Sequence, residues 1–164
     1  MTRAKTTVFL ISFLSVAAGA WLNPALAAGI SSTYRWAWND VAGWIDFYNG
    51  GTVNVLDNEI KNNAFFYSDP DSFIALSCQT TPNGNICSSV NFKVSNDGSG
   101  NLAGWAWNDN YGWISFCGNA SGGSTYNGST WVCPSRPTYQ VIIDPATGDF
   151  SGWTWNDVIG WISF

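Results

Sequence analysis

The stretch GWTWNDVIGWISF, residues 152–164, places three tryptophans on thirteen positions, and nearly the same wording occurs twice more in the chain. RWAWNDVAGWIDF fills residues 35–47 and GWAWNDNYGWISF fills residues 104–116. Each copy has the pattern of a β-hairpin, because two short aromatic runs flank a polar Asn-Asp pair that is followed by glycine. This core motif therefore decides the fold.

Side chains alternate between the two faces of a strand, so the hairpin register decides which residues share a face. A four-residue loop gives the first two tryptophans, the isoleucine and the phenylalanine of every copy one wholly apolar face. A five-residue loop instead pairs the second tryptophan with the third. We favour the four-residue loop, with its last glycine at positive φ and the Asn and Asp bonded to the turn backbone. The apolar face then comprises Trp36, Trp38, Ile45 and Phe47, then Trp105, Trp107, Ile114 and Phe116, and finally Trp153, Trp155, Ile162 and Phe164.

The third tryptophan of each copy falls on the other face in this register, beside the asparagine of the motif. The favoured interpretation is a second buried layer, since most large aromatic side chains are at least half buried. The alternative is a surface row of exposed rings flanked by amide and hydroxyl groups, which would stack on sugars or pack against a protein. The candidate ligand or partner platform therefore comprises Trp44, Trp113, Trp161, Asn39, Asn108 and Asn156.

The second and third copies extend upstream into matching strand and turn patterns, NFKVSNDGSGNLA and TYQVIIDPATGDFS. Each whole unit is predicted to be a three-stranded antiparallel meander, and such units bury their faces against neighbours. The irregular insert, residues 48–90, adds strands near 52–56, 63–67 and 72–77. The predicted fold class is all-β, with short antiparallel strands in repeated three-stranded meander units, arranged as a sandwich or repeat array with disulfide-stapled loops.

The first 27 residues have the layout of a secretory signal peptide: a basic start, an apolar run and an Ala-Leu-Ala site. An uncleaved N-terminal anchor is the alternative. The predicted organisation is a signal peptide, 1–27, followed by a β-rich repeat domain, 28–164. The expected location is secreted or at the cell surface, with no transmembrane segment after signal removal.

Four cysteines in an exported chain predict two disulfides, and the sequence alone allows three pairings. Nearest-neighbour pairing is favoured because each pair then closes one polar, glycine-bearing loop, the larger of them 117–133. No CxxC pair and no histidine occur, so no metal or cofactor is predicted. Calcium in SDPDS, LDNEIKN or SNDGSGN is the weaker alternative, because none of these stretches has EF-hand spacing. The favoured pairs are Cys78 with Cys87 and Cys117 with Cys133.

Charge and side-chain chemistry exclude several classes of function. The formal net charge is -5, and the basic residues form no cluster, which argues against nucleic acid as a partner. Without histidine, neither a Ser-His-Asp nor a Cys-His arrangement can be assembled. Asp40, Asp109 and Asp157 recur at matching positions, and a hairpin loop alone accounts for them. The chain is therefore predicted not to be an enzyme.

The GWxWNDxxGWISF core, preceded by YxVxIDxxTGxFSG, resembles a repeat of uncharacterised secreted or cell-surface proteins of bacteria. In those proteins the repeat often occurs in several copies with cysteine-containing loops between them. The resemblance implies export and a β-rich repeat, and it assigns no catalytic or binding residues.

Two classes of function follow. The favoured one is a non-enzymatic, exported structural or adhesive surface protein built from tryptophan-rich β repeats, which associates with itself or with another surface protein. The alternative is an extracellular carbohydrate-binding module that uses the repeated tryptophans as stacking platforms. Exposure of the third tryptophans separates both from a purely internal packing role, and a concave row of rings would favour a glycan.

Overall fold

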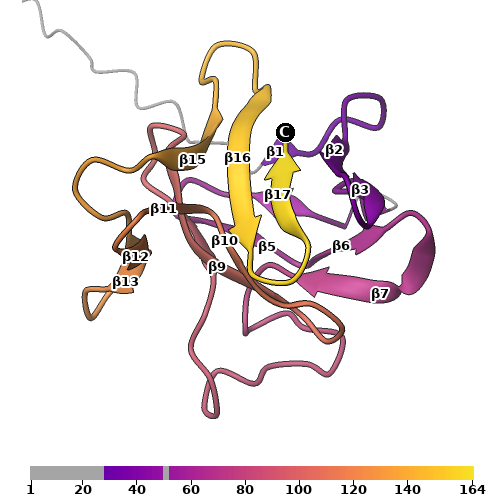
Figure 1. The fold of residues 1–164 in the computed structure, drawn as a ribbon, viewed down its shortest axis with the longest axis horizontal. Helices are drawn as coiled ribbons and strands as arrows, with labels where there is room; N and C mark the ends of the chain where they lie inside the picture. The colour runs from indigo at the N-terminus through magenta and orange to yellow at the C-terminus, as the bar shows by residue number, and fades with distance from the viewer. Residues whose placement is uncertain (1–27, 50–51) are drawn as a thin grey trace, which may run out of the picture.

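The protein is built from strands, turns and loops (Figure 1). A computed structural model describes residues 28–49 and 52–164. Within these residues there is no helix of the length and hydropathy that a membrane span requires. The predicted signal peptide, residues 1–27, lies outside the described residues.

Seventeen strands follow one another along the described chain. They are β1 (Ala28–Gly29), β2 (Trp36–Asn39), β3 (Gly43–Asp46), β4 (Asn54–Val55), β5 (Glu59–Lys61), β6 (Asn63–Phe66), β7 (Asp69–Ala75), β8 (Val94–Asn96), β9 (Leu102–Asn108), β10 (Gly112–Ser115), β11 (Cys117–Asn119), β12 (Gly122–Gly123), β13 (Thr125–Tyr126), β14 (Trp131–Val132), β15 (Tyr139–Ile143), β16 (Phe150–Asn156) and β17 (Gly160–Ser163). The all-β prediction is confirmed.

Eight of these strands close into an antiparallel barrel. Its order is β2, β3, β6, β7, β9, β10, β16 and β17, and β17 pairs back to β2. The three core motifs supply six adjacent strands, and the β6–β7 hairpin of the insert supplies the other two. The predicted sandwich or repeat array is therefore wrong. Closure satisfies the strand edges that an open array would leave unpaired.

The hairpin register also differs from the prediction. Trp155 pairs with Trp161 and Asn156 with Gly160, and both other copies have the same register. The four-residue loop is therefore wrong, and all three tryptophans of a copy share one face. The predicted positive φ of the loop glycine is confirmed, at 78° for Gly160.

The opposite face of each hairpin fills the barrel with small and aliphatic side chains. Each copy contributes an isoleucine and an alanine or threonine, all of them at most 2% exposed. An eight-stranded barrel is only wide enough inside for side chains of this size, so nine indole rings cannot enter it. The wholly apolar face that favoured the predicted register is therefore not the face that the barrel buries. These inner residues are Ala37, Ile45, Ala106, Ile114, Thr154 and Ile162.

The last phenylalanines of the three motifs meet at the barrel end opposite the hairpin loops. The Phe164 ring lies 5.0 Å from the Phe47 ring and 6.0 Å from the Phe116 ring, between centroids. Phe150 stacks on Phe164 from the flanking strand, at 6.1 Å and an interplanar angle of 27°. This cluster closes one end of the core.

A flanking strand precedes the second and third motifs, where β8 pairs with β9 and β15 pairs with β16. Gly104 and Gly152 begin these two motifs at positive φ, and the carbonyl oxygens of Lys93 and Gln140 approach them too closely for a Cβ atom. Among the described residues no such strand runs beside the first motif, where Arg35 stands at the matching position.

Both disulfides have the predicted pairing. Cys78 joins Cys87 and Cys117 joins Cys133, with Cα atoms 5.0 and 5.8 Å apart. The second bridge closes a segment that carries strands β11 to β14 along one side of the barrel (Figure 1).

Candidate functional site

The outer face of six adjacent barrel strands carries nine tryptophans, three from each core motif. In every copy the third ring packs edge-to-face between the other two. Trp161 lies 4.7 Å from Trp155 at 65° and 6.4 Å from Trp153 at 80°, and the other two copies have nearly the same distances. Aromatic rings prefer this geometry, so each triad is a fixed unit on the surface.

The recurring aspartate of the motif holds the second tryptophan ring. The Trp155 indole N–H donates to a carboxylate oxygen of Asp157 at 2.7 Å. The matching distances are 2.7 Å in the second copy and 2.9 Å in the first, to Asp109 and Asp40. The sequence placed these aspartates in the loops and missed this contact with the ring.

The motif asparagines lie inside the barrel wall, where Asn39, Asn108 and Asn156 are at most 1% exposed. The amide oxygen of Asn156 accepts hydrogen bonds from the backbone N–H groups of Val158 and Ile159, both at 2.9 Å. Its amide nitrogen donates to two carbonyl oxygens of the neighbouring hairpin, those of Tyr111 and Trp113, at 2.9 and 2.8 Å. Each such asparagine closes its own loop and joins it to the next hairpin.

The asparagines of the other two motifs join neighbouring hairpins of the barrel in the same way. Asn39 donates to the carbonyls of Ile159 and Trp161, and Asn108 donates to the Phe73 carbonyl and the Ser72 hydroxyl. The three asparagines are therefore structural, and they do not lie on the platform that the sequence predicted for them.

The β6–β7 hairpin has no such asparagine, and other donors take its place. The Ser68 hydroxyl donates to the Ala42 carbonyl at 3.2 Å, and the Tyr67 backbone N–H donates to the Trp44 carbonyl at 2.8 Å. Every hairpin of the barrel is thus hydrogen-bonded to a neighbouring hairpin near the loops.

The third tryptophans are exposed, so the predicted second buried layer is wrong. Trp44 is 52% exposed, Trp113 40% and Trp161 48%. Trp38 and Trp153 also reach 40 and 49%. The barrel wall is a single sheet, and its closure leaves the outer face of these strands uncovered unless a loop folds over it.

Small or acidic residues separate the tryptophans of neighbouring hairpins. Ser163 stands opposite Trp153 in its own hairpin and opposite Trp38 in the next one. Opposite residues in an antiparallel pair point to the same face, so these three side chains form a row across three strands. We call Trp153, Ser163 and Trp38 the open row.

The second copy has the matching row, Trp105, Ser115 and Trp155, which we call the covered row. The disulfide-closed segment lies on it. The Trp105 indole N–H donates to the Ser124 carbonyl at 3.0 Å, and a Cβ atom on Gly123 would lie 2.6 Å from the Trp105 ring. Ser115 is consequently buried.

The first copy has a third row, Trp36, Asp46 and Phe65, which is covered by a charge pair. The guanidinium of Arg35 lies 4.6 Å from the centre of the Trp36 ring, and its Nε lies 3.5 Å from a carboxylate oxygen of Asp46. Arg35 and Asp46 replace the glycine and serine of the other two copies. These two departures from the shared motif therefore occur at residues that contact each other.

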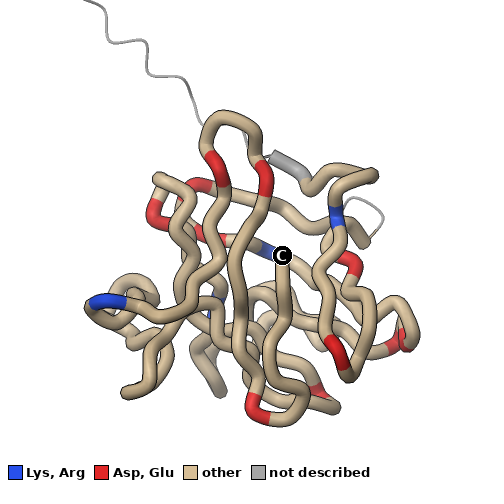
Figure 2. The backbone as a smooth tube through the Cα atoms, turned by 45° about the horizontal axis from the view of Figure 1, so that its top comes forward, with Lys and Arg blue, Asp and Glu red and all other residues tan. Residues whose placement is uncertain are grey.

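Only the open row, of the three, retains two tryptophans that are each at least 40% exposed. Trp44 stands opposite Trp38 on β3, and Trp161 lies on β17, the strand that carries Ser163. Each packs on a tryptophan of the row within its own triad. We call Trp38, Trp44, Trp153, Trp161 and Ser163 the open patch. Charged residues around the barrel are sparse and mostly acidic (Figure 2).

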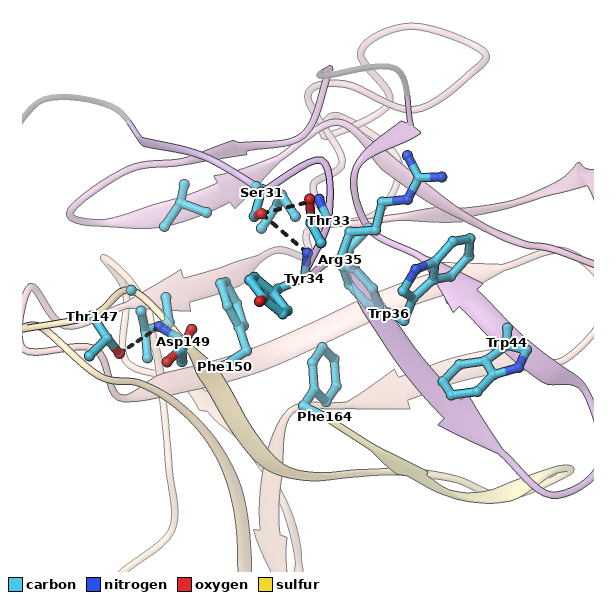
Figure 3. Close-up of a pocket in the computed structure, with 15 residues that line it drawn as sticks. Ser31, Thr33, Tyr34, Arg35, Trp36, Trp44, Thr147, Asp149, Phe150 and Phe164 are labelled. Carbon is cyan, nitrogen blue, oxygen red and sulfur yellow. Dashed lines mark hydrogen bonds between the residues drawn. The ribbon is translucent and has the colours of Figure 1, made fainter.

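A cavity of about 1040 Å³ opens at the phenylalanine end of the barrel, and Trp44 of the open patch is among its lining residues (Figure 3). Phe150 and Phe164 lie side by side in it, and Tyr34 and Trp36 flank them. Arg35 and Asp149 are among its polar lining residues. No pattern in the sequence indicates this cavity, because it forms where segments from both ends of the described chain meet.

Across residues 28–49 and 52–164, no three His, Cys, Asp or Glu side chains are grouped as metal ligands. This includes the oxygen-rich stretches considered for calcium. The arrangement offers surface for binding, through indole rings, carboxylates and one serine hydroxyl.

No protein-family model matches the chain, and neither the curated proteins nor the solved structures contain a significant match to it.

Proposed function

We propose that the protein is a non-enzymatic, exported structural or adhesive protein that attaches to partners through the open patch. The observation that carries this proposal is the rigid exposure of four large tryptophans on adjacent strands. The resemblance of the core motif to repeats of secreted or cell-surface bacterial proteins supports export, as do the two disulfides.

The extent of the patch favours binding over chance exposure. A tryptophan side chain has about 250 Å² of surface, so four rings near half exposure present about 400 to 500 Å². That is as large as the largest apolar patch on a typical monomeric protein, and such patches are often functional. Without a partner, this surface would lower solubility.

The patch is also preorganised. Trp38 is bonded to Asp40 and packs on Trp44, and Trp161 is held between Trp153 and Trp155. Rings that are already fixed lose little conformational entropy when a partner docks. Aromatic residues of this kind carry much of the energy of protein interfaces.

The curvature of the patch favours a protein partner over a glycan. The outer face of a closed barrel is convex, so a long polysaccharide would contact few of the rings at once. A glycan stays the second candidate because the carboxylates of Asp40 and Asp157 lie at the edges of the Trp38 and Trp155 rings, and Ser163 stands opposite Trp38. A short sugar chain could use one ring and one carboxylate.

Adhesion of protein-coated beads tests the proposal. Beads carrying the purified, oxidised protein are expected to clump with one another or to bind intact bacterial cells. Beads carrying the Trp38→Ser/Trp153→Ser variant are expected to lose most of this attachment. Tyr126→Ser is the matched control, since it removes an exposed aromatic ring from β13, outside the patch.

Soluble polysaccharides added to the same assay separate the two candidates. Competition by one of them at low concentration would favour the carbohydrate-binding alternative. Equal attachment of the wild type and the double variant would contradict any adhesive role of the open patch.

A further inference from the structure

We infer that the open row binds an extended glycine- and serine-rich peptide segment of a partner protein. The inference rests on the proposed function, because it names the chemistry of the partner that the open patch takes. It is drawn from the covered row, where the chain presents the same surface with such a segment already on it.

The segment on the covered row makes specific contacts with it. The Ser124 carbonyl accepts the Trp105 indole N–H at 3.0 Å, and the Ser124 hydroxyl accepts the Gly104 backbone N–H at 2.7 Å. Gly123 lies against both the Trp105 ring and the Ser115 hydroxyl, and a Cβ atom on it would lie 2.6 and 2.7 Å from them. A glycine followed by a serine is therefore what this surface accepts.

The open row repeats the groups that make these contacts. Gly152 and Trp153 match Gly104 and Trp105, and Ser163 matches Ser115. The backbone registers agree as well, since Val141 pairs with Gly152 as Val94 pairs with Gly104. Trp153 is 49% exposed, so its indole N–H is accessible to a peptide carbonyl.

The available area favours a peptide over a second globular copy. A stable interface between globular proteins buries about 800 Å² on each partner, and the open patch presents about 400 to 500 Å². Two convex barrel faces would cover even less of it. An extended strand can follow the row across β2, β17 and β16 without meeting this limit.

Side chains on the peptide decide which sequences fit. The position over the serine of the row must be glycine, because the ring and the hydroxyl leave no space for Cβ. The next residue must carry a small hydroxyl that reaches the glycine amide. Charge is not required, since none of the groups that contact Gly123 and Ser124 in the covered row is charged.

This inference is tested by titrating the oxidised protein with the octapeptide NASGGSTY, which has the sequence of residues 119–126. The probe contains no tryptophan, so indole N–H resonances in NMR spectra report on the protein alone. The Trp153 indole N–H resonance is expected to shift saturably as it gains a carbonyl acceptor, while that of Trp113 stays in place. Trp153→Phe identifies the resonance.

The peptide NASGVSTY is the matched control, because it adds a side chain at the position of Gly123. We expect it to bind at least 10-fold more weakly. Equal binding of the two peptides, or no shift of Trp153 at millimolar peptide, would overturn the inference. A Trp153 shift that depends on protein concentration and not on peptide would point to a second copy instead.

The bead assay keeps this result separate from the proposed function. If the peptide fails but the Trp38→Ser/Trp153→Ser variant still loses attachment, the open patch is adhesive and its partner is not a glycine–serine segment. If attachment is unchanged in the variant, the adhesive function itself fails whatever the peptide does.

Discussion

Asn156 donates a hydrogen bond of 2.8 Å to the carbonyl oxygen of Trp113. This contact joins the hairpin of the third core motif to the hairpin of the second. The residue is fully buried and makes four hydrogen bonds, two within its own loop and two across to the neighbour. A buried polar side chain with every group satisfied is costly to remove, because its former partners are left without water or protein.

Asn156→Ala is therefore expected to destabilise the barrel by about 3 to 5 kcal/mol. Urea unfolding followed by tryptophan fluorescence measures the change. Asn110→Ala is the control, because Asn110 is an exposed loop residue with one side-chain donor bond to Ser72, and we expect it to cost less than about 1 kcal/mol. Equal costs for the two variants would contradict the role given to Asn156.

Gly152 and Gly160 both have positive φ, but only Gly152 lies against another backbone. Gly152→Ala is expected to cost about 3 kcal/mol or more, because backbone strain adds to displacement of the Gln140 carbonyl. Gly160→Ala meets only the edge of the Trp155 ring at ordinary contact distance, so strain alone should cost about 1 to 2 kcal/mol. Thermal unfolding of both variants checks the order.

Arg35 and Asp46 are expected to act as a pair. Arg35→Gly alone leaves the buried Asp46 carboxylate without its cation, and Asp46→Ser alone leaves the guanidinium over Trp36 without its anion. The double variant has the glycine and the serine that the other two copies have at these positions. We expect its destabilisation to be smaller than the sum of the single values by about 1 kcal/mol or more.

Acrylamide quenching provides a second measurement on the same variants. Removing Arg35 uncovers Trp36, so the quenchable fraction of tryptophan emission should rise in the double variant. Additive unfolding energies together with unchanged quenching would show that the two residues are independent.

Removal of the buried Thr154 hydroxyl is expected to stabilise the fold. The side chain is fully buried where the other two copies have alanine, and its hydroxyl has no hydrogen-bond partner among the described residues. Thr154→Val should stabilise the barrel by about 1 kcal/mol, since a buried polar group without a partner is penalised. Thr130→Val should have the opposite sign, because the Thr130 hydroxyl donates to Ser95 at 2.9 Å.

Asp97 is expected to contribute to the acid sensitivity of the fold. Burial acts to raise the pKa of its carboxyl, but hydrogen bonds from the Asn101 side chain and from the Ser99 and Asn101 backbones hold that pKa below 3.8. A lowered folded-state pKa stabilises the protein above the unfolded value, and this stabilisation is lost as pH falls below 3.8 towards the folded value. Asp97→Asn should flatten the unfolding curve against pH in that range, and an unchanged slope would contradict this.

The sequence predicted the elements of this protein better than their assembly. The all-β class, the hairpin at each WND motif, the positive φ of Gly160 and the two disulfide pairs all depend on local chemistry, and the structure has each of them. The register was predicted wrongly because an apolar face was assumed to be the buried one. Both faces of these hairpins carry apolar residues, so hydrophobicity alone does not choose between them.

The candidate site was predictable only in part. The favoured prediction buried the third tryptophans in a second layer. Their exposure and the burial of Asn39, Asn108 and Asn156 follow only from the closed barrel. The Arg35 and Asp46 departures from the motif were visible in the sequence. Their contact was not, because it depends on which side chains the register brings to the same face.

The sequence by itself determined that three copies of one hairpin would form, since glycine, asparagine and aromatic spacing act within a few residues. Only the tertiary structure decided which of their rows would be covered. Closure of eight strands limits the interior to small and aliphatic side chains and turns every tryptophan triad outward. A disulfide-closed loop then covers the row at Ser115, a charge pair covers the row at Asp46, and the row at Ser163 is left open.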